Sequence, residues 1–146
     1  SSNFSIGIAV MQDLIFDAAN KLGFEWDVEI LETHHNQKID SPSGTALTLG
    51  NVISDARKQK LEHIKQTKRD GIIGKRKKNE IGFAVIRGGN VAGEHSVKFF
   101  NQNERMEINH LATDRSIFAQ GALRSAMWIS SVKPGFYSIK DVIKSY

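Results

Sequence analysis

The chain has 146 residues, of which 40% are hydrophobic and 25% are charged, and its formal net charge at neutral pH is +4. This composition is typical of one globular domain with a buried core, and it excludes an intrinsically disordered chain. The sequence has no apolar run near the ~20 residues of a transmembrane helix, and it has no cysteine. We therefore expect no membrane contact, no disulfide and a cytoplasmic location.

The N-terminal segment is expected to form a helix. Residues 4–22 carry apolar side chains at helical spacing, and Gly23 follows where the helix should stop. One row of these side chains consists of Val10, Leu14, Ala18 and Leu22, and Met11, Ile15 and Ala19 lie beside it. The chain has neither an initiator Met nor the basic start of a signal peptide, so we expect it to be cut from a longer protein.

A strand, a second helix and a basic segment are expected next. Residues 26–32 alternate between apolar and polar side chains, which predicts a strand, and residues 45–56 return to helical spacing with Ser43 as the expected N-cap. Residues 57–78 contain ten Lys or Arg and two acidic residues, so this segment carries +8. Its two glycines, Gly71 and Gly74, and its weak periodicity predict a long mobile loop.

The last part of the chain, from residue 81 on, is expected to contain most of the sheet. Residues 81–87, 94–100 and 104–112 have the composition of strands, and the short turns between them predict an antiparallel meander. A helix over residues 116–129 and a short terminal helix should follow. The predicted fold is α+β (mixed α/β): a four-stranded mixed sheet with helices packed on one face and a long basic loop.

The segment HHNQKIDSPSGTA, residues 34–46, has the composition of a ligand site. It begins where a strand should end and finishes where a helix should begin, which is where open α/β sheets bind ligands. Ser43, Gly44 and Thr45 would place unpaired N–H groups and hydroxyls at a helix N-terminus, and Lys38 adds a positive charge. This pattern predicts a carboxylate or phosphate pocket, and an ordinary capped helix without a ligand is the alternative.

The adjacent histidines His34 and His35 can exchange protons at physiological pH. If both are extended they point in opposite directions, so that one can do chemistry while the other binds or packs. Buried structural histidines are the alternative for either one. We expect no metal, because neighbouring histidines diverge on a strand and the nearby acids, Glu32 and Asp40, have no familiar ligand spacing.

The remaining candidates predict structural roles. His95 and His110 share strand faces with apolar residues, so burial with a hydrogen-bonded partner is expected for both. Arg115, at the start of the predicted helix over residues 116–129, is also expected to be structural. The sequence contains no G-x-G-x-x-G turn, no P-loop and no G-x-S-x-G elbow.

The stretch ETHHNQKIDSPSGTA resembles the signature E-x-H-H-x-x-K-x-D-x-P-S-G-T-A of dihydrodipicolinate reductase (4-hydroxy-tetrahydrodipicolinate reductase) at every fixed position. NFSIGIAVM, IGFAVIRGGNVAGEHSV and ERMEINHLATDRSIFAQGALRSAMW resemble the rest of that enzyme's C-terminal half. The resemblance covers essentially all 146 residues.

This resemblance implies a role within a two-domain enzyme of diaminopimelate and lysine biosynthesis. The family's N-terminal Rossmann domain binds NADPH or NADH, and its C-terminal domain binds substrate and forms a homotetramer through its sheet. Residues 1–146 would be the second domain alone. The chain would then lack the Rossmann domain, be inactive by itself, and leave the choice between NADH and NADPH undetermined.

The resemblance also implies roles for single residues. His34 matches the proton donor and acceptor, Lys38 a second catalytic residue that contacts substrate, and His35 a substrate ligand. Ser43, Gly44 and Thr45 match the loop that holds a substrate carboxylate. The residues that match the segment touching the nicotinamide end of the cofactor are Ser1, Ser2, Asn3 and Phe4.

A non-enzymatic function is the alternative. The basic segment over residues 57–78 would then make the chain an oligomeric binding module that contacts nucleic acid. No aromatic side chain is interleaved in this segment for stacking on bases, which disfavours that alternative.

Overall fold

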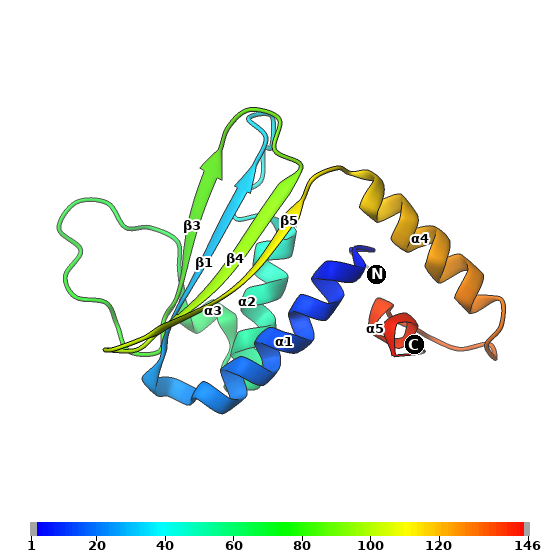
Figure 1. Cartoon of the computed structure of the whole chain (residues 1–146). Coiled ribbons are helices and arrows are strands. Elements are labelled where there is room, and N and C mark those ends of the chain that lie inside the picture. Colours follow the sequence, from blue (N-terminus) through cyan, green and yellow to red (C-terminus); the bar gives the residue numbers. More distant parts are fainter. Residues whose placement is uncertain (1–2, 145–146) are drawn as a thin grey trace.

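The computed structural model describes residues 3–144 (Figure 1). In chain order the elements are α1 (Ile6–Leu22), the 3₁₀ turn η1 (Gly23–Glu25), β1 (Asp27–His34), α2 (Gly44–Ala56), α3 (Leu61–Ile64), β2 (Lys65–Gln66), β3 (Ile81–Arg87), β4 (Gly93–Phe100), β5 (Arg105–Ala112), α4 (Ser116–Ile129) and α5 (Ile139–Ile143). Among these described residues, no helix has both the length and the apolar character that crossing a bilayer requires.

The strands form one mixed sheet in the order β2-β3-β1-β4-β5. β1 runs parallel to β3 and antiparallel to β4, and β4 is also antiparallel to β5. The predicted α+β class is confirmed, but the sheet has five strands instead of four. The extra strand, β2, is two residues long and pairs with the start of β3, so no alternating pattern could reveal it.

The predicted antiparallel meander is wrong in one connection. β3 and β4 follow each other in sequence but are not neighbours, because β1 lies between them and pairs Ile30 with both Phe83 and Val97. The first residues of β3 are buried on both faces, as is usual for a parallel strand inside a sheet. Alternation along a strand predicts which face is buried, but it does not say which strand lies alongside.

The main core lies between one face of the sheet and helices α1 and α2. Its fully buried side chains include Val28 and Ile30 of β1, Val97 and Phe99 of β4, Ile15 of α1, and Leu49 and Ile53 of α2. Each large apolar side chain buried in this way stabilises the fold by roughly 1.5–3 kcal/mol. The layer holds the start of α2 over the C-terminal end of β1.

Helix α1 faces the sheet with one of its two apolar rows, the one that contains Met11, Ile15 and Ala19. Val10 and Leu14 are 43% and 53% exposed, whereas the neighbouring Met11 and Ile15 are buried. Both stripes have helical spacing, so periodicity predicts the helix and only packing decides its rotation. The predicted stop is confirmed, since Gly23 has a φ of 64° and its N–H donates to the carbonyl of Ala19.

The C-terminal helices were predicted correctly. α4 spans Ser116–Ile129 and extends away from the sheet, as Figure 1 shows. Its small residue Gly121 allows close contact with the N-terminal segment, because a Cβ there would lie 1.8 Å from the carbonyl oxygen of Phe4. The short helix α5 contacts α1, and Lys140 forms an ion pair with Asp13 at 2.7 Å.

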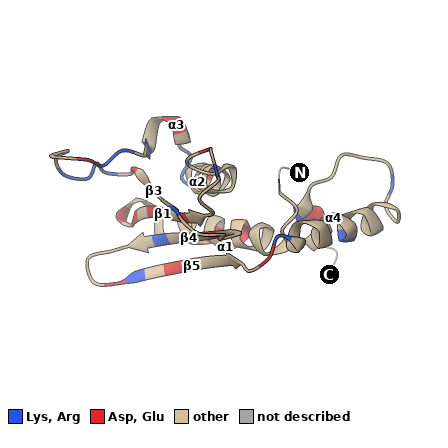
Figure 2. Ribbon diagram, turned by 90° about the horizontal axis from the view of Figure 1, so that it is seen from above, with Lys and Arg blue, Asp and Glu red and all other residues tan. Residues whose placement is uncertain are grey.

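The basic segment over residues 57–78 is more ordered than an open loop. It contains α3 and β2, and its side chain Arg57 is buried and donates to the carbonyl of Trp26 at 2.8 Å. Arg69 donates to Glu29 at 2.6 Å, and Arg76 donates to Asp27 at 2.7 Å. Figure 2 shows Lys and Arg along the loop that extends away from the sheet. Three of its arginines are therefore bound to the domain itself.

Candidate active site

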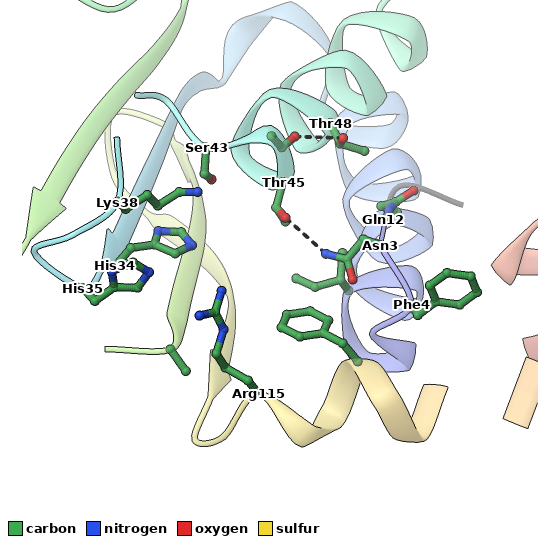
Figure 3. A pocket seen from close by; sticks show the side chains of 14 residues that line it. Asn3, Phe4, Gln12, His34, His35, Lys38, Ser43, Thr45, Thr48 and Arg115 are labelled. Atoms are coloured by element: carbon green, nitrogen blue, oxygen red, sulfur yellow. Dashed lines mark hydrogen bonds between the residues drawn. The ribbon is translucent and has the colours of Figure 1, made fainter. Parts of the chain in front are cut away.

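A cavity of about 420 Å³ opens at the C-terminal end of β1, beside the first turn of α2 (Figure 3). The side chains or backbone around it belong to Asn3, Phe4, Ile8, Gln12, His34, His35, Lys38, Ser43, Gly44, Thr45, Thr48, Ala92, Arg115 and Phe118. Its size is ordinary for a small-molecule site, and its wall mixes apolar side chains with a few convergent polar groups.

The start of α2 forms one polar wall of the cavity. Ser43 is the N-cap, as predicted, and its Oγ accepts from the N–H of Ala46 at 3.1 Å. Gly44 and Thr45 follow in the first helical turn, where backbone N–H groups lack intrahelical acceptors and attract anions. The pKa of the nearby Asp40 carboxyl is lowered in this environment. The largest cause is a hydrogen bond from Lys38, and the N–H of Gly44 makes a smaller contribution.

Lys38 brings a positive charge to the same wall. Its Nζ lies 2.8 Å from Oδ1 of Asp40, and its side chain is mostly buried. The backbone N–H of Lys38 donates to the carbonyl of His35 at 3.2 Å, which closes the turn after β1. The turn places Lys38 next to the helix start, so the two features that the sequence proposed as anion binders lie together.

Both histidines of the pair line the cavity. β1 ends at His34, and the N–H of His35 donates to the carbonyl of Val91 at 2.9 Å outside the strand. Because the chain turns there, the two rings do not point to opposite sides of an extended strand, and Figure 3 places them on the same side of the cavity. His34 is buried, whereas His35 is half-buried.

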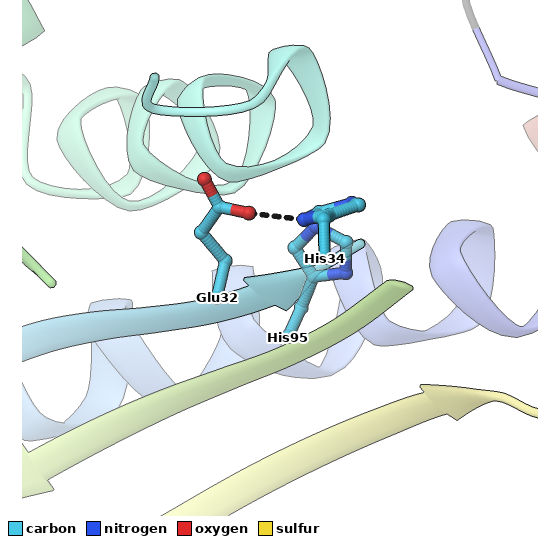
Figure 4. Close-up of side chains that lie close together, drawn as sticks. All are labelled: Glu32, His34 and His95. Atoms are coloured by element: carbon cyan, nitrogen blue, oxygen red, sulfur yellow. Dashed lines mark hydrogen bonds and ion pairs between the residues drawn. The ribbon is translucent and has the colours of Figure 1, made fainter. Parts of the chain in front are cut away.

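A buried carboxylate that was not among the predicted site residues contacts His34 on the side away from the cavity. Nδ1 of His34 donates to Oε2 of Glu32, a side chain only 1% exposed (Figure 4). Burial lowers the pKa of His34, and the carboxylate of Glu32 opposes that effect by favouring the protonated ring. The available signal was the alternation of β1, since Glu32 shares its face with the core residues Val28 and Ile30.

Arg87 of β3 neutralises the charge of Glu32. Its Nη2 donates to Oε1 at 2.9 Å and its Nη1 to Oε2 at 3.2 Å, while the N–H of Ser43 donates to Oε1 at 2.9 Å. Burial alone would raise the pKa of Glu32, but the hydrogen bonds from Arg87 and Ser43 and the charges of His34 and Arg87 together lower it. Glu32 is therefore an ionised carboxylate surrounded by donors.

His95 completes the base of the site. Its ring packs edge-on against His34 with 5.1 Å between centroids, and its Nε2 lies 3.3 Å from Oγ of Ser43. Burial, together with the nearby His34, lowers the pKa of His95 to about 4, so the ring is neutral at physiological pH. The predicted burial of His95 with a hydrogen-bonded partner is confirmed. His110 is half-buried, with Nε2 3.4 Å from Oγ of Ser5.

Glu32, His34 and His95 each bring one possible metal-ligand atom within 4.8 Å of the others. The hydrogen bonds give this cluster a different explanation. Both oxygens of Glu32 already accept from Arg87, and Oε2 also accepts from Nδ1 of His34, so the negative charge of the carboxylate is already paired. We therefore interpret the cluster as a hydrogen-bonded support for His34, and the absence of a metal stays a prediction.

The N-terminal segment reaches the same cavity. Nδ2 of Asn3 donates to Oγ1 of Thr45 at 3.1 Å, and Phe4 lines the wall next to it. Ser1 and Ser2, predicted to contact the cofactor with them, lie outside the described residues. The candidate site residues between positions 3 and 45 therefore line one cavity, and the role of each stays a prediction.

Arg115 has a different place from the one expected. Its guanidinium points into the cavity on the side of His34 and His35, as Figure 3 shows, so a purely structural role does not describe it. The sequence could not reveal this position, because Arg115 approaches the site through the loop between β5 and α4, 69 residues after Ala46 at the end of the motif.

Comparison with known proteins identifies the family. The family model described as "Dihydrodipicolinate reductase, C-terminus" matches residues 7–143. The chain is 49% identical over 144 residues to a 4-hydroxy-tetrahydrodipicolinate reductase of Agrobacterium fabrum, covering 98% of this chain and 52% of that protein. It is 48% identical over 143 residues to the reductase of Campylobacter curvus, covering 98% of this chain and 56% of that protein.

A solved structure has the same fold. Dipicolinate-bound dihydrodipicolinate reductase from Paenisporosarcina sp. TG-14 matches with a TM-score of 0.74 and 25% identity, over 97% of this chain and 52% of that one. The chain spans about half the length of the relatives it matches. None of these comparisons supports a nucleic-acid-binding function. The chain belongs to the dihydrodipicolinate reductase family and corresponds to its C-terminal region.

Proposed function

We propose that this chain is the substrate-binding domain of an NADPH- or NADH-dependent reductase that converts 4-hydroxy-tetrahydrodipicolinate to tetrahydrodipicolinate. The observation that carries the proposal is the cavity at the end of β1, where a buried His34, the charged Lys38 and the first turn of α2 line one space. The names of the relatives and the dipicolinate bound to the Paenisporosarcina protein support this substrate class.

The substrate is a ring with two carboxylates, and the cavity has two cationic places for them. One carboxylate would bind at Ser43–Thr45 beside Lys38, where backbone N–H groups and a full charge act together. The other would bind Arg115, whose planar guanidinium suits a carboxylate. Two fixed anchors would orient the ring and remove its rotational freedom before reaction.

His34 would supply the proton of the reduction. The 4-hydroxyl group leaves as water, which gives a conjugated imine. Hydride addition to that imine leaves negative charge on the substrate, and a positioned acid neutralises that charge as it develops. A histidine in this role accelerates such a step by roughly 10²–10⁴-fold. Lys38 would hold the substrate and act as the second proton donor, and His35 would contact the ring from the same side.

The nicotinamide cofactor supplies the hydride when bound. The residues of this chain suit only its nicotinamide end, since Phe4, Ile8 and Phe118 give the cavity an apolar side against which a planar ring can rest. Asn3 would fix that side through its hydrogen bond to Thr45, and Ser1 and Ser2 would extend the same segment. The rest of the cofactor, and the choice between NADH and NADPH, would belong to a Rossmann domain outside residues 1–146.

A homotetramer formed through the sheet is part of the same proposal. Helices cover one face of the sheet, whereas Leu31, Ile86 and Leu111 lie on the other, and the last two are 48% and 62% exposed. Exposed apolar side chains on a sheet face are typical of subunit contacts. Light scattering after gel filtration would measure the mass of the assembly, and Leu111→Asp should lower that mass.

A cytoplasmic setting is also proposed, and it rests on the cysteine-free sequence.

Ligand titration tests the central claim. Dipicolinate, a stable planar analogue, should bind the 146-residue chain and raise its melting temperature in proportion to the logarithm of ligand concentration once above saturation. Pyridine with a single carboxylate is the control, and it should bind more weakly because it reaches one anchor only. The complete gene product containing these residues should reduce the substrate with NADPH or NADH. Failure of both experiments would reject the proposed function.

A further inference from the structure

Glu32 stands out because the proposed reaction does not touch it, yet it is a charged side chain in the core. It lies at the back of His34, away from the cavity that His34 lines, and it is only 1% exposed. A buried carboxylate is costly unless donors surround it. Four donors do so here: one from His34, one from Ser43 and two from Arg87.

We propose that Glu32 is a positioning residue, held by Arg87, whose carboxylate keeps the proton of neutral His34 on Nδ1 and thereby directs Nε2 to the substrate. The inference rests on the proposed function and adds to it the residue that sets which nitrogen transfers the proton. Glu32 itself contacts neither substrate nor cofactor in this arrangement, so it acts only through His34.

The hydrogen-bond chemistry carries the first step. An ionised carboxylate can only accept, so the nitrogen of His34 that faces Glu32 must carry a hydrogen. In the neutral ring, Nε2 then holds the lone pair, and in the protonated ring Nε2–H is the hydrogen available to the cavity. Gly93 leaves space beside that nitrogen, since a Cβ there would lie 3.0 Å from Nε2.

Arg87 carries the second step, because it fixes Glu32 relative to the rest of the site. Besides its two bonds to the carboxylate, Arg87 donates to the carbonyl of Asp40 at 2.9 Å and to that of Ile86 at 2.8 Å. The guanidinium thus joins β3, β1 and the turn that carries Lys38. Glu32 in turn accepts from the N–H of Ser43, so one ion pair holds both the proposed acid and the proposed carboxylate-binding turn.

The charges around His34 give the expected pH effect. The groups that face it are Glu32 of β1, Arg87 of β3, His95 of β4, and His35, Lys38 and Arg115 around the cavity. Among them only the Glu32 carboxylate favours the protonated ring. Its removal would lower the pKa of His34 further, and an acid with a lower pKa loses its proton at a lower pH.

Glu32→Gln is the direct test. The carboxylate of Glu32 offers two acceptor oxygens to the four donors, whereas the amide of glutamine offers only one. In the complete gene product, kcat should fall by roughly 10²-fold, as for a misplaced general acid, with little change in KM. The high-pH limb of the kcat profile should move to lower pH. The matched control is Glu29→Gln, which removes an arginine-paired carboxylate from the opposite face of the same strand and should leave kcat and the limb unchanged.

A readout independent of turnover uses nitrogen NMR on the 146-residue chain, with His34 assigned by comparison with His34→Gln. Neutral His34 should carry its hydrogen on Nδ1 in the wild type and in Glu29→Gln, and on Nε2 in Glu32→Gln. If Glu32→Gln does not fold, Glu32→Gln/Arg87→Gln removes both charges of the ion pair, and the same measurements are made on that variant.

The outcomes separate this inference from the proposed function. An inactive wild-type gene product would reject the function, while the tautomer of His34 would still test the support by Glu32. An active wild type with unchanged kcat, pH limb and tautomer in Glu32→Gln would reject the inference alone. A variant that loses only melting temperature, with tautomer and limb unchanged, would reduce Glu32 to a structural role and also overturn the inference.

Discussion

Two polar segments of this chain look similar in sequence and differ in what their charges meet. Residues 34–46 surround a cavity, with His34 buried and Lys38 mostly buried, and its hydroxyls and N–H groups gather at the start of α2. Residues 57–78 hold more positive charge, but Arg69 and Arg76 contact the domain's own carboxylates, Arg57 binds a backbone carbonyl, and the lysines are exposed. A high density of charge therefore does not by itself predict a site, whereas convergence of partly buried polar groups does.

The strongest test of this comparison replaces the proposed acid. His34→Gln in the complete gene product should lower kcat by roughly 10²–10⁴-fold while KM changes little, because the lost interaction forms mainly in the transition state. His63→Gln, in the basic segment, is the matched control and should keep wild-type kinetics, since His63 is exposed and is not among the residues that line the cavity. A His34→Gln enzyme with near-normal kcat would remove His34 from the proton-transfer step.

The second test uses pH and the histidine at the base of the site. Burial lowers the pKa of His95 to about 4 in the folded protein, whereas the ring has its ordinary pKa of 6.5 in the unfolded chain. Between these two values the unfolded chain binds a proton that the folded protein does not bind. The associated stability, about 3 kcal/mol, is fully present above pH 6.5 and is lost progressively as the pH falls towards 4. Urea unfolding across this range should show the loss.

His95→Gln should reduce this pH dependence of the unfolding free energy, and His63→Gln should retain it because His63 is exposed. Both variants need to be compared with wild type at the same ionic strength. Equal slopes of unfolding free energy against pH in wild type and His95→Gln would show that another group causes the acid sensitivity.

The third test compares lysines. Lys38→Ala should weaken dipicolinate binding by about 1.5–3 kcal/mol, the usual worth of a hydrogen bond to a charged group, and should also lower kcat in the complete gene product. Calorimetric titration of the 146-residue chain measures the binding. Lys75→Ala, a lysine of the basic segment, should bind like wild type, and equal losses in the two variants would argue for general electrostatic attraction instead of a specific contact.

The smallest expected effect concerns the basic segment itself. Arg76→Ala removes ion pairs with Asp27 and Glu29 and should lower the free energy of unfolding by about 1 kcal/mol, because these pairs are partly exposed. Dipicolinate affinity should not change. Reduced affinity with normal stability would instead connect this segment to the ligand site and contradict the contrast between the two regions.

Much of the site could be predicted because it lies in one local segment. Residues 34–46 contain the end of a strand, a turn and a helix start, and such transitions depend on neighbours in sequence. Glu32 was missed as a support, although its position on the buried face of β1 was visible in the alternation. Arg115 was given a structural role because no local pattern connects it to the motif.

The sequence by itself determined the helices α1, α2 and α4, the N-cap Ser43, the fold class and the composition of the site, because capping and periodicity act over a few residues. Only the tertiary structure decided that β1 lies between β3 and β4, which face of α1 is buried, and that Arg87 reaches Glu32 across 55 positions. These features depend on which distant surfaces exclude water together, and alternation along a single strand does not specify its partner.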